Sequence, residues 1–250
     1  MKLLASDFDN TLLFYEGMKE DDLKAIKNFQ KQGHLFGLCT GRTLEGVQRP
    51  SKNYDIQYDF YILNTGSYIL DRNLNVIFQK KIPLTLVKKL QKLVGEDIHM
   101  SVVLNNTMLI IDKQNVSKYP GTRINSLDEI KATEVEACSF HYQSGEIDIA
   151  KETINKILKT YGQEISAYQN NEHIDCAAFG CSKGAAIDII TDYFNIQKDD
   201  IYGIGDSFND LPMFSHVTHS YTFDYASTDV QKQADHIVHN LKECIEDILD

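Results

Sequence analysis

Two pairs of aspartates fall directly after short apolar stretches, where buried strands are expected to end. Asp7 and Asp9 follow the first apolar stretch of the chain, and Asp206 and Asp210 follow the apolar stretch 201–204. In open parallel sheets, ligands bind beyond the carboxyl ends of the strands. Carboxylates gathered at that edge repel one another unless a cation lies between them, and hard oxygen ligands suit Mg²⁺. The sequence therefore predicts a magnesium site formed by these four acids.

The spacing of the first pair supports this interpretation. In an extended chain, positions i and i+2 project to the same side, so the carboxylates of Asp7 and Asp9 would face one place while Phe8 turns toward the core. The alternative is that Asp9 only begins a polar turn and that Asp206 only caps the helix that follows it. A cap does not require a further acid at Asp210, which favours a functional role.

Two further segments could hold a phosphate group. Thr40, Gly41 and Arg42 lie between an expected strand and an expected helix, where a hydroxyl group and free backbone N–H groups can bind phosphate oxygens. Lys183 begins another expected helix, where its charge opposes the helix dipole, so a functional reason for it is favoured. The alternatives are a common turn at residues 40–42 and an ordinary surface charge at Lys183.

The pattern of apolar residues places these segments in an α/β fold. Short apolar runs alternate with amphipathic stretches near both ends of the chain, which indicates a doubly wound, mostly parallel sheet. The middle of the chain changes to amphipathic helices at 84–94 and 147–161 and to strands that pair locally. We therefore predict a Rossmann-like catalytic core from residues 1–82 and 180–250, with an inserted α+β cap domain at 83–179.

The individual elements follow from the same pattern. In the core, the expected strands are 2–6, 34–39, 60–63, 68–70, 76–78, 201–204 and 217–222, and the expected helices are 19–32, 44–49, 183–194, 209–214 and 241–249. In the cap, the expected strands are 102–104, 108–111, 135–142 and 174–179.

Composition and charge argue against several classes of protein. The 250 residues carry a formal net charge of −11 without a basic cluster, which argues against nucleic-acid binding. The five cysteines are scattered without a C-x-x-C pair, which argues against a disulfide framework or a structural zinc site. No apolar segment approaches the roughly 18 residues of a membrane span, and the first apolar stretch is too short for a signal peptide. We therefore expect a cytoplasmic protein without a membrane partner. The sequence does not indicate the oligomeric state; a monomer is compatible with it, because nothing points to an obligate partner.

The candidate residues occur in a characteristic order of acid pair, threonine, lysine and acid pair. In this order the sequence resembles phosphatases of the haloacid dehalogenase superfamily, and more narrowly the Cof-type branch of sugar phosphatases. DFDNT at 7–11 matches the first motif, DxDxT, and LCTGR at 38–42 matches the second. SKG at 182–184 matches the third motif and GDSFND at 205–210 the fourth. The resemblance covers nearly the whole chain, including a large cap between the second and third motifs.

The resemblance implies a role for each matched residue. Asp7 would be the nucleophile that forms an aspartyl-phosphate, and Asp9 would be the general acid and then the general base. Mg²⁺ would be the cofactor, held by Asp7, the backbone carbonyl of Asp9 and Asp206, with Asp210 completing the metal surround or orienting Lys183. The residues implied to bind phosphate are Thr40, Gly41, Arg42, Lys183 and Asn209.

The implied function is Mg²⁺-dependent hydrolysis of a small phosphorylated metabolite, such as a sugar or polyol phosphate. A phosphomutase of the same superfamily would share every motif, and a non-catalytic phosphoacceptor or metabolite-binding protein is a third possibility. Asp9 argues against the last, because a pure acceptor needs no general acid.

Three positions depart from the pattern of that branch. Asn10 stands where glycine is usual, and Asn is expected to tolerate the unusual backbone angles there. Residues 64–66 read NTG in place of Asn-Gly-Ala, and residues 223–226 read FDYA where Gly-Asn-Ala is common. The surroundings of the substrate are therefore expected to differ at these two places.

Overall fold

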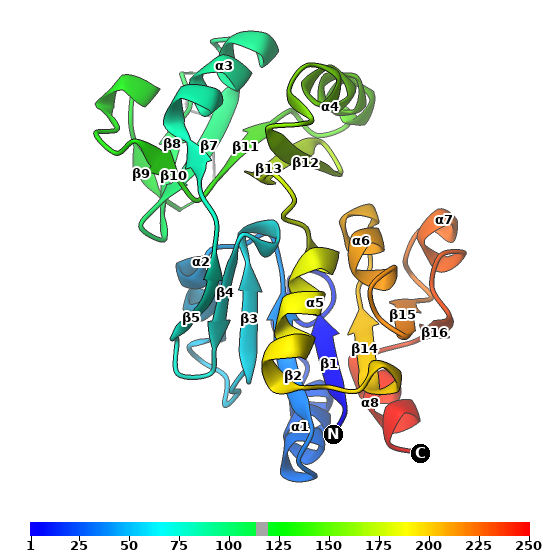
Figure 1. Cartoon of the computed structure of the whole chain (residues 1–250). Coiled ribbons are helices and arrows are strands. Elements are labelled where there is room, and N and C mark those ends of the chain that lie inside the picture. The colour runs from blue at the N-terminus through cyan, green and yellow to red at the C-terminus, as the bar shows by residue number, and fades with distance from the viewer. Residues whose placement is uncertain (114–119) are drawn as a thin grey trace. The chain divides into compact units, whose positions relative to one another are not determined.

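We describe the protein from a computed structural model, which covers residues 1–113 and 120–250 (Figure 1). The chain divides into two compact units. The core unit comprises residues 1–42, 46–79 and 182–250, and the inserted unit comprises residues 43–45 and 80–181. The sequence placed the two boundaries at 82/83 and 179/180, so the inserted unit takes in a few more residues at each end. That the inserted unit acts as a cap remains a proposal.

The core unit is built on one eight-stranded sheet with the strand order β16-β15-β14-β1-β2-β3-β4-β5. Neighbouring strands from β16 to β3 run parallel, and β4 and β5 add antiparallel pairs at one edge. The doubly wound, mostly parallel sheet predicted from the sequence is therefore confirmed. The strands are Leu3–Ser6 (β1), Leu35–Cys39 (β2), Phe60–Leu63 (β3), Tyr68–Asp71 (β4), Val76–Gln79 (β5), Ile201–Ile204 (β14), His219–Phe223 (β15) and His236–Val238 (β16).

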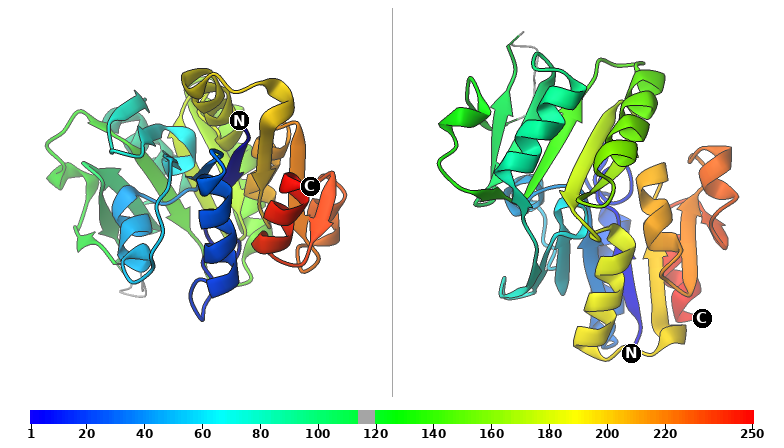
Figure 2. Two further views of the ribbon diagram at one scale, coloured as in Figure 1. Left: turned by 90° about the horizontal axis from the view of Figure 1, so that it is seen from below. Right: turned by 45° about the horizontal axis from the view of Figure 1, so that its top comes forward.

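Helices cover both faces of this sheet (Figure 2). On one face α1 (Glu20–Lys31) packs against α8 (Leu241–Leu249), and on the other α5 (Lys183–Phe194) packs against α6 (Leu211–Phe214). The shorter helices α2 and α7 span Leu44–Ser51 and Thr228–Gln231. Three acids in the first turn of α1 lie where the helix dipole favours negative charge, which helps the helix to begin there.

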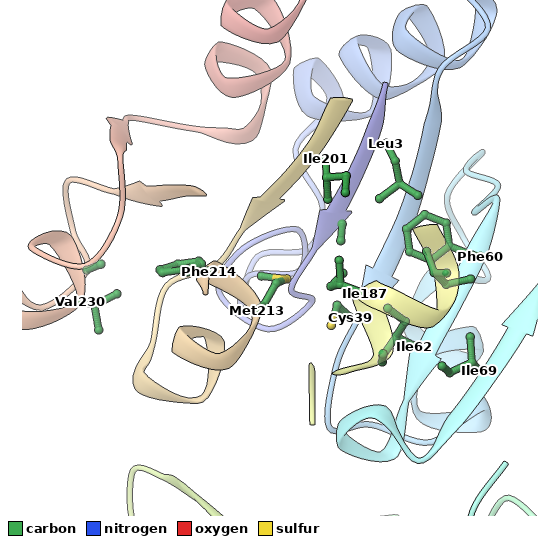
Figure 3. Packing of buried hydrophobic residues seen from close by; sticks show 14 residues of the cluster. Leu3, Cys39, Phe60, Ile62, Ile69, Ile187, Ile201, Met213, Phe214 and Val230 are labelled. Carbon is green, nitrogen blue, oxygen red and sulfur yellow. The ribbon is translucent and has the colours of Figure 1, made fainter. Parts of the chain in front are cut away.

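One apolar cluster joins α5 to the sheet (Figure 3). Ile187 of α5 is fully buried in a cluster that includes Leu3 of β1, Phe60 of β3 and Met213 of α6. Burial of each such side chain contributes about 2 kcal/mol of transfer free energy. Because several of these side chains come from α5 and β1, the first turn of α5 is held beside the carboxyl end of β1.

The inserted unit is α+β, as predicted. Its six-stranded sheet has the order β12-β13-β11-β7-β8-β9, in which only β8 and β9 pair in parallel, and β6 and β10 form a separate pair. Helices α3 (Leu84–Val94) and α4 (Ile147–Tyr161) contact each other, and α4 packs on β12 and β13. The strands are Ile82–Pro83 (β6), His99–Leu104 (β7), Thr107–Ile111 (β8), Thr122–Arg123 (β9), Glu134–Val135 (β10), Ala137–His141 (β11), Ile165–Asn170 (β12) and His173–Ala178 (β13). No helix in the described part of the chain has the length and apolar character that crossing a bilayer requires.

Several expected elements differ for local reasons. The expected strand 135–142 is interrupted at Glu136, whose carboxylate accepts hydrogen bonds from the backbone N–H groups of Asn105 and Asn106. The expected helix 209–214 begins instead with a 3-10 turn at Phe208–Asp210, followed by α6. Strands β12 and β16 were not predicted, because their polar and histidine residues obscure the alternation that marks a strand.

Two glycines provide a test of how closely the start of α5 packs against the rest of the core unit. Gly66 and Gly33 both have positive φ angles, of 90° and 85°, but a Cβ atom on Gly66 would lie 2.1 Å from the backbone oxygen of Ser182, whereas one on Gly33 would have no heavy atom of the described residues within 4 Å. We expect Gly33→Ala to lower the free energy of unfolding by about 1 kcal/mol and Gly66→Ala by about 3 kcal/mol. Urea titration of both variants measures this difference, and equal losses would contradict the packing described for Gly66.

Candidate active site

Three neighbouring parallel strands deliver the candidate residues to one edge of the core sheet. β1 lies between β14 and β2, with Ser6 paired to Ile204 and to Leu38. The chain leaves these strands into Asp7, Thr40 and the loop that carries Asp206. The expectation that the motifs meet at the carboxyl ends of the strands is therefore met by the geometry. The candidate residues meet here because β14, β1 and β2 run parallel and end at the same edge of the sheet.

Lys183 lies between two of the carboxylates at this edge of the sheet. Its Nζ donates to Oδ1 of Asp7 and to Oδ1 of Asp210, both at 2.6 Å, and its side chain is only 1% exposed. It lies in the first turn of α5, whose start is capped by the Ser182 hydroxyl oxygen accepting from the backbone N–H of Ala185 at 2.8 Å. A surface charge, which was the alternative interpretation for Lys183, is thereby excluded.

The acids around Lys183 carry more negative charge than one ammonium can balance. Carboxylate oxygens of Asp7, Asp206 and Asp210 lie within 4.8 Å of one another. Burial raises the pKa of Asp7 well above its usual value, against the opposing effect of Lys183, and repulsion from Asp210 and Asp206 raises it further. Burial and then Asp210 raise the pKa of Asp206 to about 7. Burial alone would lower the pKa of Lys183, but Asp210 and Asp7 raise it, so this group stays an ammonium.

This donor set fits a hard divalent cation. Three carboxylates with a single buried ammonium leave an excess of negative charge. The raised pKa values of Asp7 and Asp206 show that ionising both groups in this buried place is unfavourable. An ion between Asp7 and Asp206 would relieve this repulsion with the oxygen ligands that Mg²⁺ prefers.

Besides its contact with Lys183, Asp210 also holds the loop that contains Asp206 and Ser207. Its Oδ2 accepts hydrogen bonds from the backbone N–H groups of Asp206 and Ser207, both at 3.0 Å. The Ser207 side chain in turn accepts from the backbone N–H of Asp210, and these contacts form a capping box at the start of the 3-10 turn. A Cβ on Gly205 would lie 2.3 Å from the carboxyl carbon of Asp210, so this close approach requires glycine.

Asp9 lies outside the group of three carboxylates within the described residues. Its two oxygens are held by Arg42, with Nε donating at 2.8 Å and Nη2 at 2.6 Å, while Nη1 of Arg42 donates to the backbone oxygen of Gly46. The expectation that Asp7 and Asp9 face one place is thus not met by the carboxylates. β1 ends at Ser6, so the alternation of a strand does not extend to Asp9.

The remaining predicted residues lie around this edge. Thr40 is buried, and its hydroxyl oxygen accepts from the backbone N–H of Arg42 at 3.2 Å. Gly41 is exposed. Asn209 accepts from the Ser207 hydroxyl at 2.7 Å through Oδ1. Phe8 is fully buried, as predicted, with the guanidinium of Arg42 over its ring at 5.1 Å.

Three residues at this edge were not assigned a role from the sequence. The buried Thr11 donates its hydroxyl to Oδ1 of Asp206 at 3.2 Å. Asn64 is buried with a φ angle of 49°, and among the described residues neither its Oδ1 nor its Nδ2 has a hydrogen-bond partner. Tyr225 donates its hydroxyl to the backbone oxygen of Asn10. For Asn64 and Tyr225, the sequence signal was the departure from the family pattern at 64–66 and at 223–226.

Comparison with known proteins agrees with this geometry. The model of the haloacid dehalogenase-like hydrolase family matches residues 4–244. The chain is 29% identical over 231 residues to an uncharacterised protein of Mycoplasma capricolum, covering 85% of this chain and 86% of that protein. It is 25% identical over 238 residues to the 5-amino-6-(5-phospho-D-ribitylamino)uracil phosphatase YcsE of Bacillus subtilis, covering 95% and 89%. The solved structure of the HAD subclass IIB sugar phosphatase BT4131 has the same fold, with a TM-score of 0.81 at 19% identity, covering 98% of this chain and 95% of that one.

The raised pKa of Asp206 makes a prediction about stability. Because the folded protein holds this proton more tightly than the unfolded chain does, the stabilisation is present at low pH and is lost as the pH rises through about 7. With a chelator present, we expect Asp206→Asn to be more stable than the wild type at pH 8, by about 1 to 2 kcal/mol more than at pH 5. The exposed Asp229→Asn is the control and should change stability by less than about 0.5 kcal/mol. An Asp206→Asn protein no more stable than the wild type at pH 8 would contradict this account.

Proposed function

The chain belongs to the haloacid dehalogenase-like hydrolase family and is a phosphatase, and we propose that it releases phosphate from small sugar or polyol phosphates with the help of Mg²⁺. The observation that carries this proposal is the buried Lys183 between Asp7 and Asp210. A buried ammonium beside a carboxylate at a strand end offers an anion-binding group and a nucleophile in contact with each other.

Asp7 is the proposed nucleophile. An oxygen of its carboxylate attacks the phosphorus atom, the bond from phosphorus to the leaving oxygen breaks, and an aspartyl-phosphate forms. Lys183 has already fixed one oxygen of Asp7, so the direction of the carboxylate is set before the substrate arrives. The same ammonium can contact a phosphoryl oxygen as charge spreads over the group in the transition state.

Asp9 is the proposed general acid and base. Its carboxyl proton passes to the leaving oxygen in the first step, and its carboxylate then takes a proton from the water that attacks the aspartyl-phosphate, which restores Asp7 and releases phosphate. Because Arg42 holds both carboxylate oxygens, Asp9 gives up at least one of these contacts when it carries the proton. Asp9 is half-exposed, unlike Asp7, and therefore has the room to move.

Mg²⁺ would be held by Asp7 and Asp206, with the backbone oxygen of Asp9, and when bound it would lower the repulsion between carboxylate and phosphate. Asp210 would contribute mainly through Lys183 and through the loop that it organises. The proposed phosphate-binding residues are Thr40, Gly41, Arg42, Lys183 and Asn209.

A small phosphate ester is the proposed substrate class. Two of the similar proteins carry names of phosphatases that act on a phosphorylated ribityl compound and on sugar phosphates. A polyol or sugar phosphate offers hydroxyl groups that polar side chains can recognise. We propose that side chains of the inserted unit select among such compounds.

A phosphate-release screen with and without Mg²⁺ tests the proposal. The panel includes sugar phosphates, polyol phosphates, 5-amino-6-(5-phospho-D-ribitylamino)uracil and para-nitrophenyl phosphate. We expect Mg²⁺-dependent release from several members, and we expect Asp7→Asn to reduce it to background because an amide is a poor nucleophile, although it can still accept the hydrogen bond from Lys183.

The exposed Asp229→Asn serves as the matched control and should retain full activity. An Asp7→Asn protein that keeps Mg²⁺-dependent turnover of para-nitrophenyl phosphate would rule out the nucleophile. Transfer of the phosphoryl group to a second position of the same sugar, without free phosphate, would indicate a mutase.

A further inference from the structure

Tyr225 connects the end of β15 to the loop that carries Asp9. Its ring stacks on Phe223 of the same segment, with ring centroids 4.7 Å apart and an interplanar angle of 11°. It also meets the edge of Phe14, at 6.3 Å and 75°, and Phe14 lies in the loop that follows Asp9. The ring therefore has two aromatic contacts, although Tyr225 is half-exposed.

The hydroxyl of Tyr225 donates to the backbone oxygen of Asn10 at 2.5 Å, across 215 residues of sequence. Partial burial and the negative charges of Asp206 and other nearby acids raise the pKa of Tyr225 above its usual value. The hydroxyl therefore keeps its proton and acts as a hydrogen-bond donor over the whole neutral range. A donor locked in place by a stacked ring is a rigid support for the group that accepts from it.

The acceptor lies where the backbone of the loop turns. Asn10 follows Asp9 directly and has a φ angle of 54°, in the left-handed region. Its N–H donates to the backbone oxygen of Leu13 at 2.8 Å, and the next residue, Thr11, donates to Asp206. The bond from Tyr225 adds a fixed point on the carbonyl side of the same residue, so both peptide groups of Asn10 are oriented.

Asp9 is thus positioned from two ends. Arg42 holds its carboxylate, and Tyr225 and Leu13 hold the residue that follows it in the chain. When Asp9 releases its contacts with Arg42 to transfer a proton, its backbone is still held through Asn10, and this backbone then orients the side chain.

We propose that Tyr225 is a positioning residue for Asp9, which directs the proton of Asp9 to the leaving oxygen by fixing the backbone of Asn10. This inference rests on the proposed function. It assigns Tyr225 no contact with substrate or metal. A purely structural role for the ring would leave the acid step unchanged, so the chemistry of the leaving group separates the two.

The test compares Tyr225→Phe with the wild type on para-nitrophenyl phosphate and phenyl phosphate, which have the same ring but leaving groups of different acidity. Phenylalanine keeps the stacking on Phe223 and removes only the hydroxyl. Because the less acidic phenol needs the proton more, we expect kcat/KM to fall about tenfold for phenyl phosphate and less than about twofold for para-nitrophenyl phosphate. The melting temperature of the variant, measured alongside, should stay close to that of the wild type.

Two further proteins complete the experiment. Tyr193→Phe removes a hydroxyl from an exposed tyrosine in the last turn of α5, and it should leave both kcat/KM values unchanged. In the background of Asp9→Asn, which has no acid to position, removal of the Tyr225 hydroxyl should not change the ratio of the two kcat/KM values.

Equal losses on both esters, or no loss on either, would overturn the assignment of Tyr225 while the proposed function stands. A further change of the ratio in the Asp9→Asn background would overturn it as well. A wild-type protein that hydrolyses neither ester in Mg²⁺ would overturn the proposed function and this assignment together.

Discussion

The buried contact of Lys183 with Asp7 and Asp210 is the constraint on which the site depends. A buried ammonium is costly unless it is paired, and this one also opposes the dipole of α5. Two carboxylates offset that cost, and they come from the end of β1 and from the loop after β14. Loss of Lys183 would leave the buried Asp7 and Asp210 without a compensating charge, so the first turn of α5 and two strand ends are held together by one group.

The same contact explains why the site calls for a cation. Lys183 neutralises part of the charge, but Asp206 brings a third carboxylate into the group. The pKa values of Asp7 and Asp206 are raised because this excess is buried. A phosphate ester adds more negative charge still, so a divalent ion beside these oxygens is the simplest electrostatic complement.

The site has a rigid part and a part with room to move. Lys183, Asp7 and Asp210 are buried and fixed by short contacts, which suits the binding of a phosphoryl group in one orientation. Asp9 and Arg42 are more exposed and contact each other through two hydrogen bonds at the surface of the site. The proton transfer proposed for Asp9 needs room to move, because the same carboxyl group would serve two successive steps.

The sequence pointed to the residues of both parts, but not to the contact of Asp9 with Arg42. Parallel strands end together, so acids and a threonine placed just after three apolar runs could be expected to meet. A lysine opposing a helix dipole favoured a functional reason for that charge, but its pairing with Asp7 and Asp210 was seen only in the structure. The position of the Asp9 carboxylate was not predictable from alternation, because β1 ends at Ser6 and the chain turns at Asn10. The contact of Tyr225 with Asn10 spans 215 residues and belongs to no motif.

Rapid-quench mapping of the phosphoryl group tests the central claim most directly. The wild-type protein is mixed with para-nitrophenyl phosphate and Mg²⁺, quenched in acid within one turnover, and digested for mass spectrometry. The account predicts a burst of nitrophenol and one phosphoryl group on the peptide that contains Asp7. Turnover with the phosphoryl group on another residue, or with none on the protein at any time before product release, would contradict it.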